Sequence, residues 1–286
     1  MTLYSEQPLV FDCLGERLPG ILSIPEERCG TGVVIVVGGP QYRVGSHRQF
    51  VLLARSLAAA GFPVLRFDTR GMGDATGNFP GFEHLGPDIA SAVQAFRQAL
   101  PDLQKVVLWG LCDAASAILI SQPLLTGISG LVLLNPWVRN AETLANAEIK
   151  HYYHKRLLDR AFWVKLLSGQ VNVLASLGEF AGKLWRRWRG GSRPVASVDF
   201  RARMVDGWQA FQGPSLLILS GVDMVAAEFV EFAASHPQLA ALLQRPDIVR
   251  LDLDAADHTF SSALLRSQVE MATGDWLSNL SRGEPR

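Results

Sequence analysis

One stretch of the chain has the residue types and spacing of a reactive side chain held at a sharp turn. Residues 106–109 are apolar and strand-like, and they run directly into residues 110–114, with sequence GLCDA. In a nucleophile elbow, a strand turns abruptly into a helix and the apex residue exposes its side chain on a strained backbone. Gly110 and Ala114 supply the small residues that this close approach of the two backbones requires. The pattern predicts that Cys112, at the apex, is a nucleophile, whereas an isolated cysteine would be read as an inert buried thiol.

A thiol needs a base, and the base needs an acid that orients it, because a free thiol is mostly protonated at neutral pH. In an open parallel sheet both partners are expected at the carboxyl ends of later strands, in the order nucleophile, acid, histidine. Asp223 follows the strand-like residues 215–219, and His258 follows residues 248–253. We therefore expect Cys112, His258 and Asp223 to act together. The competing interpretations are a surface position for His258 and a turn-capping role for Asp223.

Two further aspartates lie closer to His258 in sequence. Asp254 and Asp257 are four residues and one residue away. Adjacent side chains of an extended segment point in opposite directions, so Asp257 is a poor candidate for orienting the histidine ring.

Acyl chemistry also needs hydrogen-bond donors for the negative oxygen that develops on the substrate. The backbone N–H of Asp113, directly after the nucleophile, is the expected first donor. The second is expected in the turn after the apolar residues 33–37, where Pro40 has no N–H to offer. Gly39 and Gln41 remain as alternatives, and a plain tight turn without any catalytic role is the other interpretation.

The elements that must position these residues alternate between strand and helix. An antiparallel pair at residues 9–14 and 17–24 is followed by apolar strands, which suit a sheet covered on both faces. The predicted parallel strands are residues 33–37, 64–67, 105–109, 131–134, 215–219 and 248–253. The predicted helices are residues 49–60, 87–100, 114–121, 225–243 (broken at Pro237) and 262–280. This order predicts an α/β fold with a doubly wound, mostly parallel sheet.

The alternation stops between residues 139 and 211, where no strand pattern is evident. A segment of this length is too long for a structureless loop in a compact domain, so we expect a helical cap inserted over the carboxyl ends of the strands. The prediction is a core of residues 1–138 and 212–286 with a cap of residues 139–211. The basic and aromatic residues 183–193 are read as a solvated helix face, with contact to a membrane or an acidic partner as the less favoured alternative.

Composition limits the class of protein. The 286 residues include 27 Lys and Arg and 27 Asp and Glu, so the chain has no net positive charge that would attract nucleic acid. Three cysteines are too few for a disulfide framework and suit a reducing compartment, and Cys13 and Cys29 are read as packing or surface residues. Without an evident signal peptide or membrane span, a soluble cytoplasmic protein is expected.

Neither a metal nor a cofactor is expected. His151 and His154 lie three residues apart and would share a helix face, but no carboxylate or cysteine stands at ligand spacing beside them. Asp68 and Arg70 belong to a polar, glycine-rich turn, which we read as structural because its glycines allow a sharp exit from the strand.

The elbow, the later aspartate and the final histidine together resemble the α/β-hydrolase superfamily over nearly the whole chain. More closely, residues 38–48, 67–74 and 110–114 are similar to the exosortase A system-associated hydrolases, type 1, which occur with bacterial exopolysaccharide and protein-sorting clusters. Two features depart from ordinary esterases. The nucleophile is Cys112 where serine is usual, and Val37 or Gly38 stands where a histidine usually precedes the oxyanion-loop glycine.

A cysteine acyl-enzyme is itself a thioester, so accepting an acyl group from another thioester is nearly neutral in energy, whereas attack on an amide is uphill. We therefore expect a hydrolase for small-molecule thioesters or activated esters, with no cofactor. The resemblance implies coenzyme A or an acyl carrier protein as carriers of the acyl group. The alternatives are an acyltransferase with a non-water acceptor and a catalytically silent scaffold that binds a partner.

Overall fold

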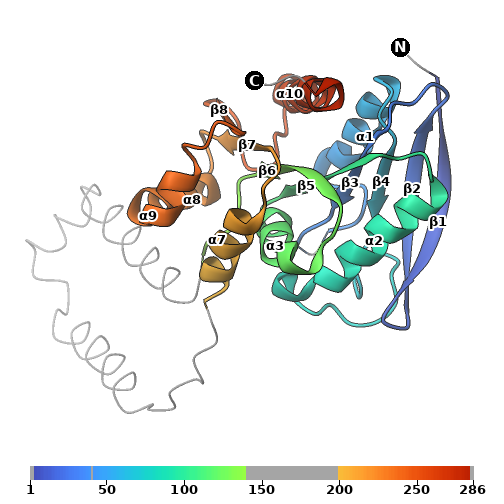
Figure 1. Cartoon of the computed structure of the whole chain (residues 1–286), viewed down its shortest axis with the longest axis horizontal. Coiled ribbons are helices and arrows are strands. Elements are labelled where there is room, and N and C mark those ends of the chain that lie inside the picture. The colour runs from blue at the N-terminus through green and yellow to red at the C-terminus, as the bar shows by residue number, and fades with distance from the viewer. Residues whose placement is uncertain (1–2, 40, 140–198, 284–286) are drawn as a thin grey trace, which may run out of the picture. The chain divides into compact units, whose positions relative to one another are not determined.

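The computed structural model describes residues 3–39, 41–139 and 199–283, which form an eight-stranded sheet flanked by helices (Figure 1). The strands are β1 (Tyr4–Cys13), β2 (Glu16–Pro25), β3 (Thr31–Val36), β4 (Val64–Phe67), β5 (Lys105–Leu111), β6 (Ile128–Leu134), β7 (Ser215–Ser220) and β8 (Ile248–Leu253). The helices are α1 (Gln49–Ala59), α2 (Gly86–Ala99), α3 (Asp113–Ser121), α7 (Phe200–Ala210), α8 (Met224–Ser235), α9 (Pro237–Leu242) and α10 (Ala263–Arg282). Three short 3₁₀ helices are η1 (Ser46–Arg48), η2 (Phe82–His84) and η3 (Gln122–Leu124).

The strand order is β1-β2-β4-β3-β5-β6-β7-β8. β1 pairs with β2 and β2 with β4 in antiparallel fashion, and every pair from β4 to β8 is parallel. β3 and β5 lie at the centre, where the register pairs Val36 with Gly110. The carboxyl ends of β5, β7 and β8 therefore meet along one edge of the sheet, which is the edge from which the candidate site is built.

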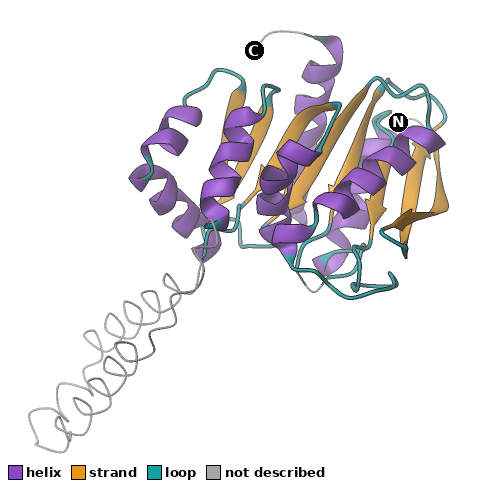
Figure 2. Ribbon diagram, turned by 60° about the horizontal axis from the view of Figure 1, so that its bottom comes forward, coloured by secondary structure: helices purple, strands orange, loops and turns teal. Residues whose placement is uncertain are grey.

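Helices cover both faces of the sheet, as Figure 2 shows. Val33 and Ile35 pack on one side in a core shared with α1 and α10, and Val34 and Val36 pack on the other side with α2, α3 and α7. All six residues of β3 are buried, because a strand covered on both faces has no solvent-facing positions. The predicted α/β fold with a doubly wound, mostly parallel sheet is confirmed.

Helix α7 corrects the end of the predicted cap. Residues 199–211 were assigned to the cap, yet α7 packs against α3 and belongs with the core, which resumes at Asp199. Gly207 permits this packing, because a Cβ at this position would lie 1.9 Å from the carbonyl oxygen of Leu119. Trp208 is fully buried and its Nε1 donates to Ser215 Oγ at 3.3 Å. Helical periodicity alone cannot show which neighbour a helix packs against.

Residues 140–198 of the predicted cap lie outside the described residues, and so do His151, His154 and the basic residues 183–193. Within the described part of the chain, no helix combines the length and apolar character needed to cross a bilayer.

Candidate active site

Cys112 stands at the apex of a sharp strand-to-helix turn, between the end of β5 and the start of α3. Its backbone has φ 61° and ψ −125°, a region that a side-chain-bearing residue occupies at a cost of about 1–3 kcal/mol. The turn is possible because Gly110 has no side chain: a Cβ there would lie 2.7 Å from Ile118 Cδ1 and 3.0 Å from the backbone of Ala114 and Ala115. The predicted elbow geometry is therefore present.

Hydrogen bonds hold the elbow against the end of β6. The amide of Cys112 donates to the carbonyl of Leu134 at 2.8 Å, and the amide of Trp137 donates back to the carbonyl of Cys112 at 3.3 Å. Ser116 Oγ, one turn into α3, donates to the carbonyl of Trp137 at 2.7 Å. The strained backbone is thus held from both sides, and the partly buried Cys112 side chain packs against the core on the α1 and α10 face of the sheet.

Asp223 carries out two tasks at the carboxyl end of β7. Its carboxylate caps α8, accepting from the amides of Val225 at 3.1 Å and Ala226 at 3.2 Å. The same carboxylate lies 2.8 Å from His258 Nδ1. Burial acts to raise the pKa of Asp223, but hydrogen bonding and the charge of His258, together with the two amides, outweigh burial and hold the pKa below its usual value. The Asp223 carboxylate therefore both caps α8 and contacts the His258 ring.

His258 is placed between the two other residues expected to work with it. Hydrogen bonding to Asp223, and next to Cys112, raises the pKa of His258 to about 10, against the opposing effect of burial. The imidazole therefore carries a proton at neutral pH, and its Nε2 is the ring nitrogen left for the sulfur because Nδ1 faces Asp223. The His258 ring contacts the Asp223 carboxylate directly, and Cys112 is near enough to the ring to raise its pKa.

The glycine turn after β3 is arranged differently from the expectation. The amide of Gly39 donates to Asp113 Oδ2 at 2.8 Å, and the amide of Gln41 donates to the carbonyl of Gly39 at 2.8 Å. Both amides predicted as the second oxyanion donor are thus engaged within the protein. Gly38 makes room for the aspartate, because a Cβ on Gly38 would lie 2.1 Å from Asp113 Oδ1.

The Asp113 carboxyl, in the residue directly after Cys112, is half-buried. Burial raises its pKa above the usual value, although hydrogen bonds from the amides of Gly39, Ala114 and Asp113 itself, and the positive charge of His258, act in the opposite direction. The sequence predicted a role for the backbone N–H of Asp113 as an oxyanion donor, but it gave no indication of the contact made by the side chain.

Asn135 lies between the segments that carry the candidate residues and was not predicted from the sequence. It is fully buried at the end of β6 with φ 43°. Its Oδ1 accepts from the amide of Ser220 at 2.9 Å, and its Nδ2 donates to Ser220 Oγ at 2.8 Å and to the carbonyl of His258 at 3.4 Å. Asn135 therefore joins the ends of β6 and β7 to the histidine segment. An amide residue directly before Pro136, at the end of an apolar strand, was the available signal.

The polar turn after β4 is structural, in agreement with its interpretation from sequence. Asp68 is fully buried and accepts from the amides of Arg43 at 2.7 Å and Asp74 at 3.0 Å, and it also pairs with the Arg43 guanidinium. Arg70 pairs with buried Asp88 at 2.7 Å. These contacts fix the loop that follows the glycine turn.

Three further groups considered from the sequence are Asp254, Asp257 and Cys13. Asp257 caps its own turn, accepting from the amide of Ser261 at 2.8 Å, and Asp254 is exposed. Cys13 is buried, and burial raises the pKa of its thiol. Within residues 3–39, 41–139 and 199–283, no three His, Cys, Asp or Glu side chains come together to hold a metal ion.

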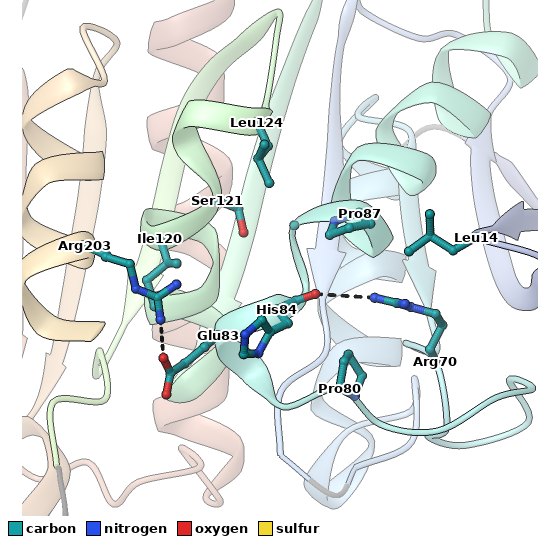
Figure 3. Close-up of a pocket in the computed structure, with 11 residues that line it drawn as sticks. Leu14, Arg70, Pro80, Glu83, His84, Pro87, Ile120, Ser121, Leu124 and Arg203 are labelled. Carbon is teal, nitrogen blue, oxygen red and sulfur yellow. Dashed lines mark hydrogen bonds and ion pairs between the residues drawn. The ribbon is translucent and has the colours of Figure 1, made fainter. Parts of the chain in front are cut away.

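A cavity of about 660 Å³ opens among η2, the start of α2, the end of α3 and α7 (Figure 3). Its polar rim includes Arg203, which pairs with Glu83, and Arg70, whose guanidinium donates to the carbonyl of His84 at 3.4 Å. Ser121, the last residue of α3, lines the cavity, whereas Cys112 precedes the first residue of that helix. A helix of nine residues spans about 13 Å, so this cavity is separate from the cysteine–histidine pair.

Solved structures share this fold at low sequence identity. The Pyrococcus furiosus esterase Pf2001 matches with a TM-score of 0.65 and 16% identity, over 97% of this chain and 91% of that chain. An esterase domain of a Rhodothermus marinus protein matches with a TM-score of 0.58 and 19% identity, over 95% and 97%. Est1E from Butyrivibrio proteoclasticus, solved with ferulic acid, matches with a TM-score of 0.60 and 15% identity, over 95% and 98%.

No curated protein sequence matches the chain. The family model described as "Alpha/beta hydrolase family" matches residues 33–272, which include most of β3, the cysteine elbow and the segments that carry the aspartate and the histidine. With the fold, the strand order and this match in agreement, the chain is a member of the alpha/beta hydrolase family.

Proposed function

We propose that this protein is an acyl-transfer hydrolase in which Cys112 is the nucleophile, His258 the general base and Asp223 the acid that orients it. One observation carries the proposal: the Asp223 carboxylate lies 2.8 Å from His258 Nδ1, and the sulfur at the apex of the elbow acts with it to raise the pKa of His258. An imidazolium beside a sulfur favours the thiolate, which is the nucleophilic form of cysteine.

The reaction follows from these positions. The proton of the Cys112 thiol is held on His258 before the substrate arrives, and the thiolate attacks the carbonyl carbon of the substrate. The tetrahedral adduct collapses as the leaving group departs with the proton from His258, and an acyl-cysteine thioester remains. Water then gives its proton to His258, attacks the thioester and releases the acid, and the sulfur recovers its starting state.

The substrate class follows from the sulfur nucleophile. Transfer from a thioester to Cys112 exchanges one carbon–sulfur bond for another and is nearly neutral in energy, whereas an amide donor would be uphill. A small-molecule thioester or an activated ester is the expected acyl donor, and coenzyme A or an acyl carrier protein is the expected carrier. The esterases with the same fold are consistent with acyl chemistry at this site. A role alongside bacterial exosortase systems rests only on the resemblance of residues 38–48, 67–74 and 110–114.

Intact-mass detection of an acyl adduct tests the proposal. The protein is mixed with a panel of acyl-coenzyme A thioesters and p-nitrophenyl esters, and the experiment is repeated with Cys112→Ala and with Cys29→Ala as the matched control. We expect an adduct in the wild type and in Cys29→Ala and none in Cys112→Ala. An adduct of equal yield in Cys112→Ala would remove this cysteine from the mechanism. Adding alcohol and amine acceptors to the acylated protein separates hydrolysis from transfer.

A further inference from the structure

The turn that should receive the substrate oxyanion already holds an anion of the protein itself. The amide of Gly39 donates to Asp113 Oδ2 at 2.8 Å, and Asp113 Oδ1 occupies the space where a Cβ of Gly38 would stand. Gly39 has φ 61°, a left-handed conformation that glycine adopts without strain. The turn is therefore shaped around the Asp113 carboxyl.

An oxyanion site works only when its donors are free to receive the charge that develops in the transition state, and one such donor is worth about 10²–10³ in rate. An amide that donates to a carboxylate is not free. A carboxylate next to the developing oxyanion also repels it. Acylation of Cys112 is therefore opposed as long as Asp113 stays in contact with Gly39.

We propose that the Asp113 carboxylate is a resident anion of the oxyanion site, which must leave the Gly39 amide before Cys112 can be acylated. This inference rests on the function proposed above. The step is a rotation of one side chain, and no bond is formed or broken. Burial raises the pKa of Asp113 against the hydrogen bond from the Gly39 amide, so the charged form of this carboxyl is disfavoured where it lies.

The arrangement has a consequence for substrate choice. The carbonyl oxygen of the substrate must compete with a carboxylate for the Gly39 amide. Activated thioesters reach a tetrahedral adduct easily and can compete, whereas ordinary esters and amides cannot. Asp113 thus acts as a specificity-determining residue for the same site.

Two reagents separate the oxyanion effect from the general reactivity of the sulfur. Phenyl thioacetate acylates Cys112 through a tetrahedral oxyanion, whereas iodoacetamide alkylates it at a saturated carbon and forms no oxyanion. Both rates are measured at Cys112 by intact mass, and their ratio cancels any change in thiolate reactivity. The variants are Asp113→Ala, which empties the site, and Asp113→Asn, which leaves a neutral acceptor for Gly39. Asp257→Asn, which removes a carboxylate next to His258 in sequence but outside the glycine turn, is the control.

We expect the ratio of acylation to alkylation to rise about 10-fold or more in Asp113→Ala, since one oxyanion donor is freed. The ratio of acylation to alkylation should rise by less in Asp113→Asn, and it should keep its wild-type value in Asp257→Asn. The amide proton of Gly39 supplies a readout independent of catalysis. Its NMR shift should follow the titration of Asp113 in the wild type and lose that titration in Asp113→Asn.

A ratio that stays constant or falls in both Asp113 variants would overturn the proposal, as would a Gly39 resonance that does not titrate. Absence of acylation in every variant, while Cys112 is alkylated, would also overturn it. Failure of the proposed function is a different result, in which neither reagent reacts faster at Cys112 than at Cys29.

Discussion

The pKa of His258 is the quantity through which the candidate site can be tested most directly. Its value of about 10, against an ordinary 6.5, is caused first by hydrogen bonding to Asp223. Each pKa unit corresponds to about 1.4 kcal/mol, so the whole difference amounts to about 5 kcal/mol. Because 35% of the His258 side chain is exposed, solvent screening reduces this figure, and we expect about half of it, near 2.5 kcal/mol. The Asp223→Asn substitution should therefore lower the pKa of His258 by about 2.

Asparagine is the informative replacement because it keeps the helix cap. Asp223 accepts from the amides of Val225 and Ala226 at the start of α8, and an asparagine oxygen can accept in the same place. Ring-nitrogen NMR of His258 as a function of pH measures the pKa in the wild type, in Asp223→Asn and in Asp254→Asn, a matched control that removes an exposed carboxylate of the same segment. A His258 pKa near 6.5 in the wild type, or an unchanged pKa in Asp223→Asn, would refute the reasoning.

The sign of the accompanying stability change follows from the same pKa. A histidine whose pKa is higher in the folded state than in the unfolded state stabilises the fold. This contribution is complete at pH values below the unfolded-state pKa and is lost as the pH rises through the folded-state pKa. The difference in free energy of unfolding between wild type and Asp223→Asn should therefore be largest near pH 6, where Asp223 is ionised, and should shrink towards pH 10. Urea unfolding across this pH range measures it, and a difference that grows with pH contradicts the assignment.

Two further predictions concern the elements that support the site. Gly207→Ala should lower the free energy of unfolding by about 1–3 kcal/mol, because its Cβ would lie 1.9 Å from the carbonyl oxygen of Leu119. The control is Gly274→Ala in α10, where the nearest contact would be at 3.8 Å, and it should be neutral or stabilising. Equal effects of the two substitutions in thermal melts would argue against the packing of α7 on α3. Asn135→Ala leaves the buried amide of Ser220 without its acceptor, which should cost about 1–3 kcal/mol in urea unfolding and should also slow acylation; full acylation in a destabilised variant would show that Asn135 does not position the histidine.

The local features of the elbow were open to prediction from sequence. Gly110 and Ala114 flank Cys112 at the only spacing that lets a strand and a helix meet so closely, and this requirement holds whatever surrounds the turn. The strands were evident for a similar reason, since a strand buried on both faces must be apolar throughout. The order of strands along the chain then placed Asp223 and His258 at the same edge of the sheet as the cysteine.

Long-range packing decided the rest. The contact of the Asp113 side chain with the glycine turn is visible only in the tertiary structure. The two segments are more than seventy residues apart, and neither local sequence indicates that they meet. The assignment of α7 to the core depends on its contact with α3, since a helical pattern reports one buried face without identifying the neighbour. Sequence alone therefore determined which groups are available for chemistry at the carboxyl edge of the sheet. The tertiary structure decided which hydrogen-bond donors are already occupied there, because that depends on side chains from distant segments meeting in one small volume.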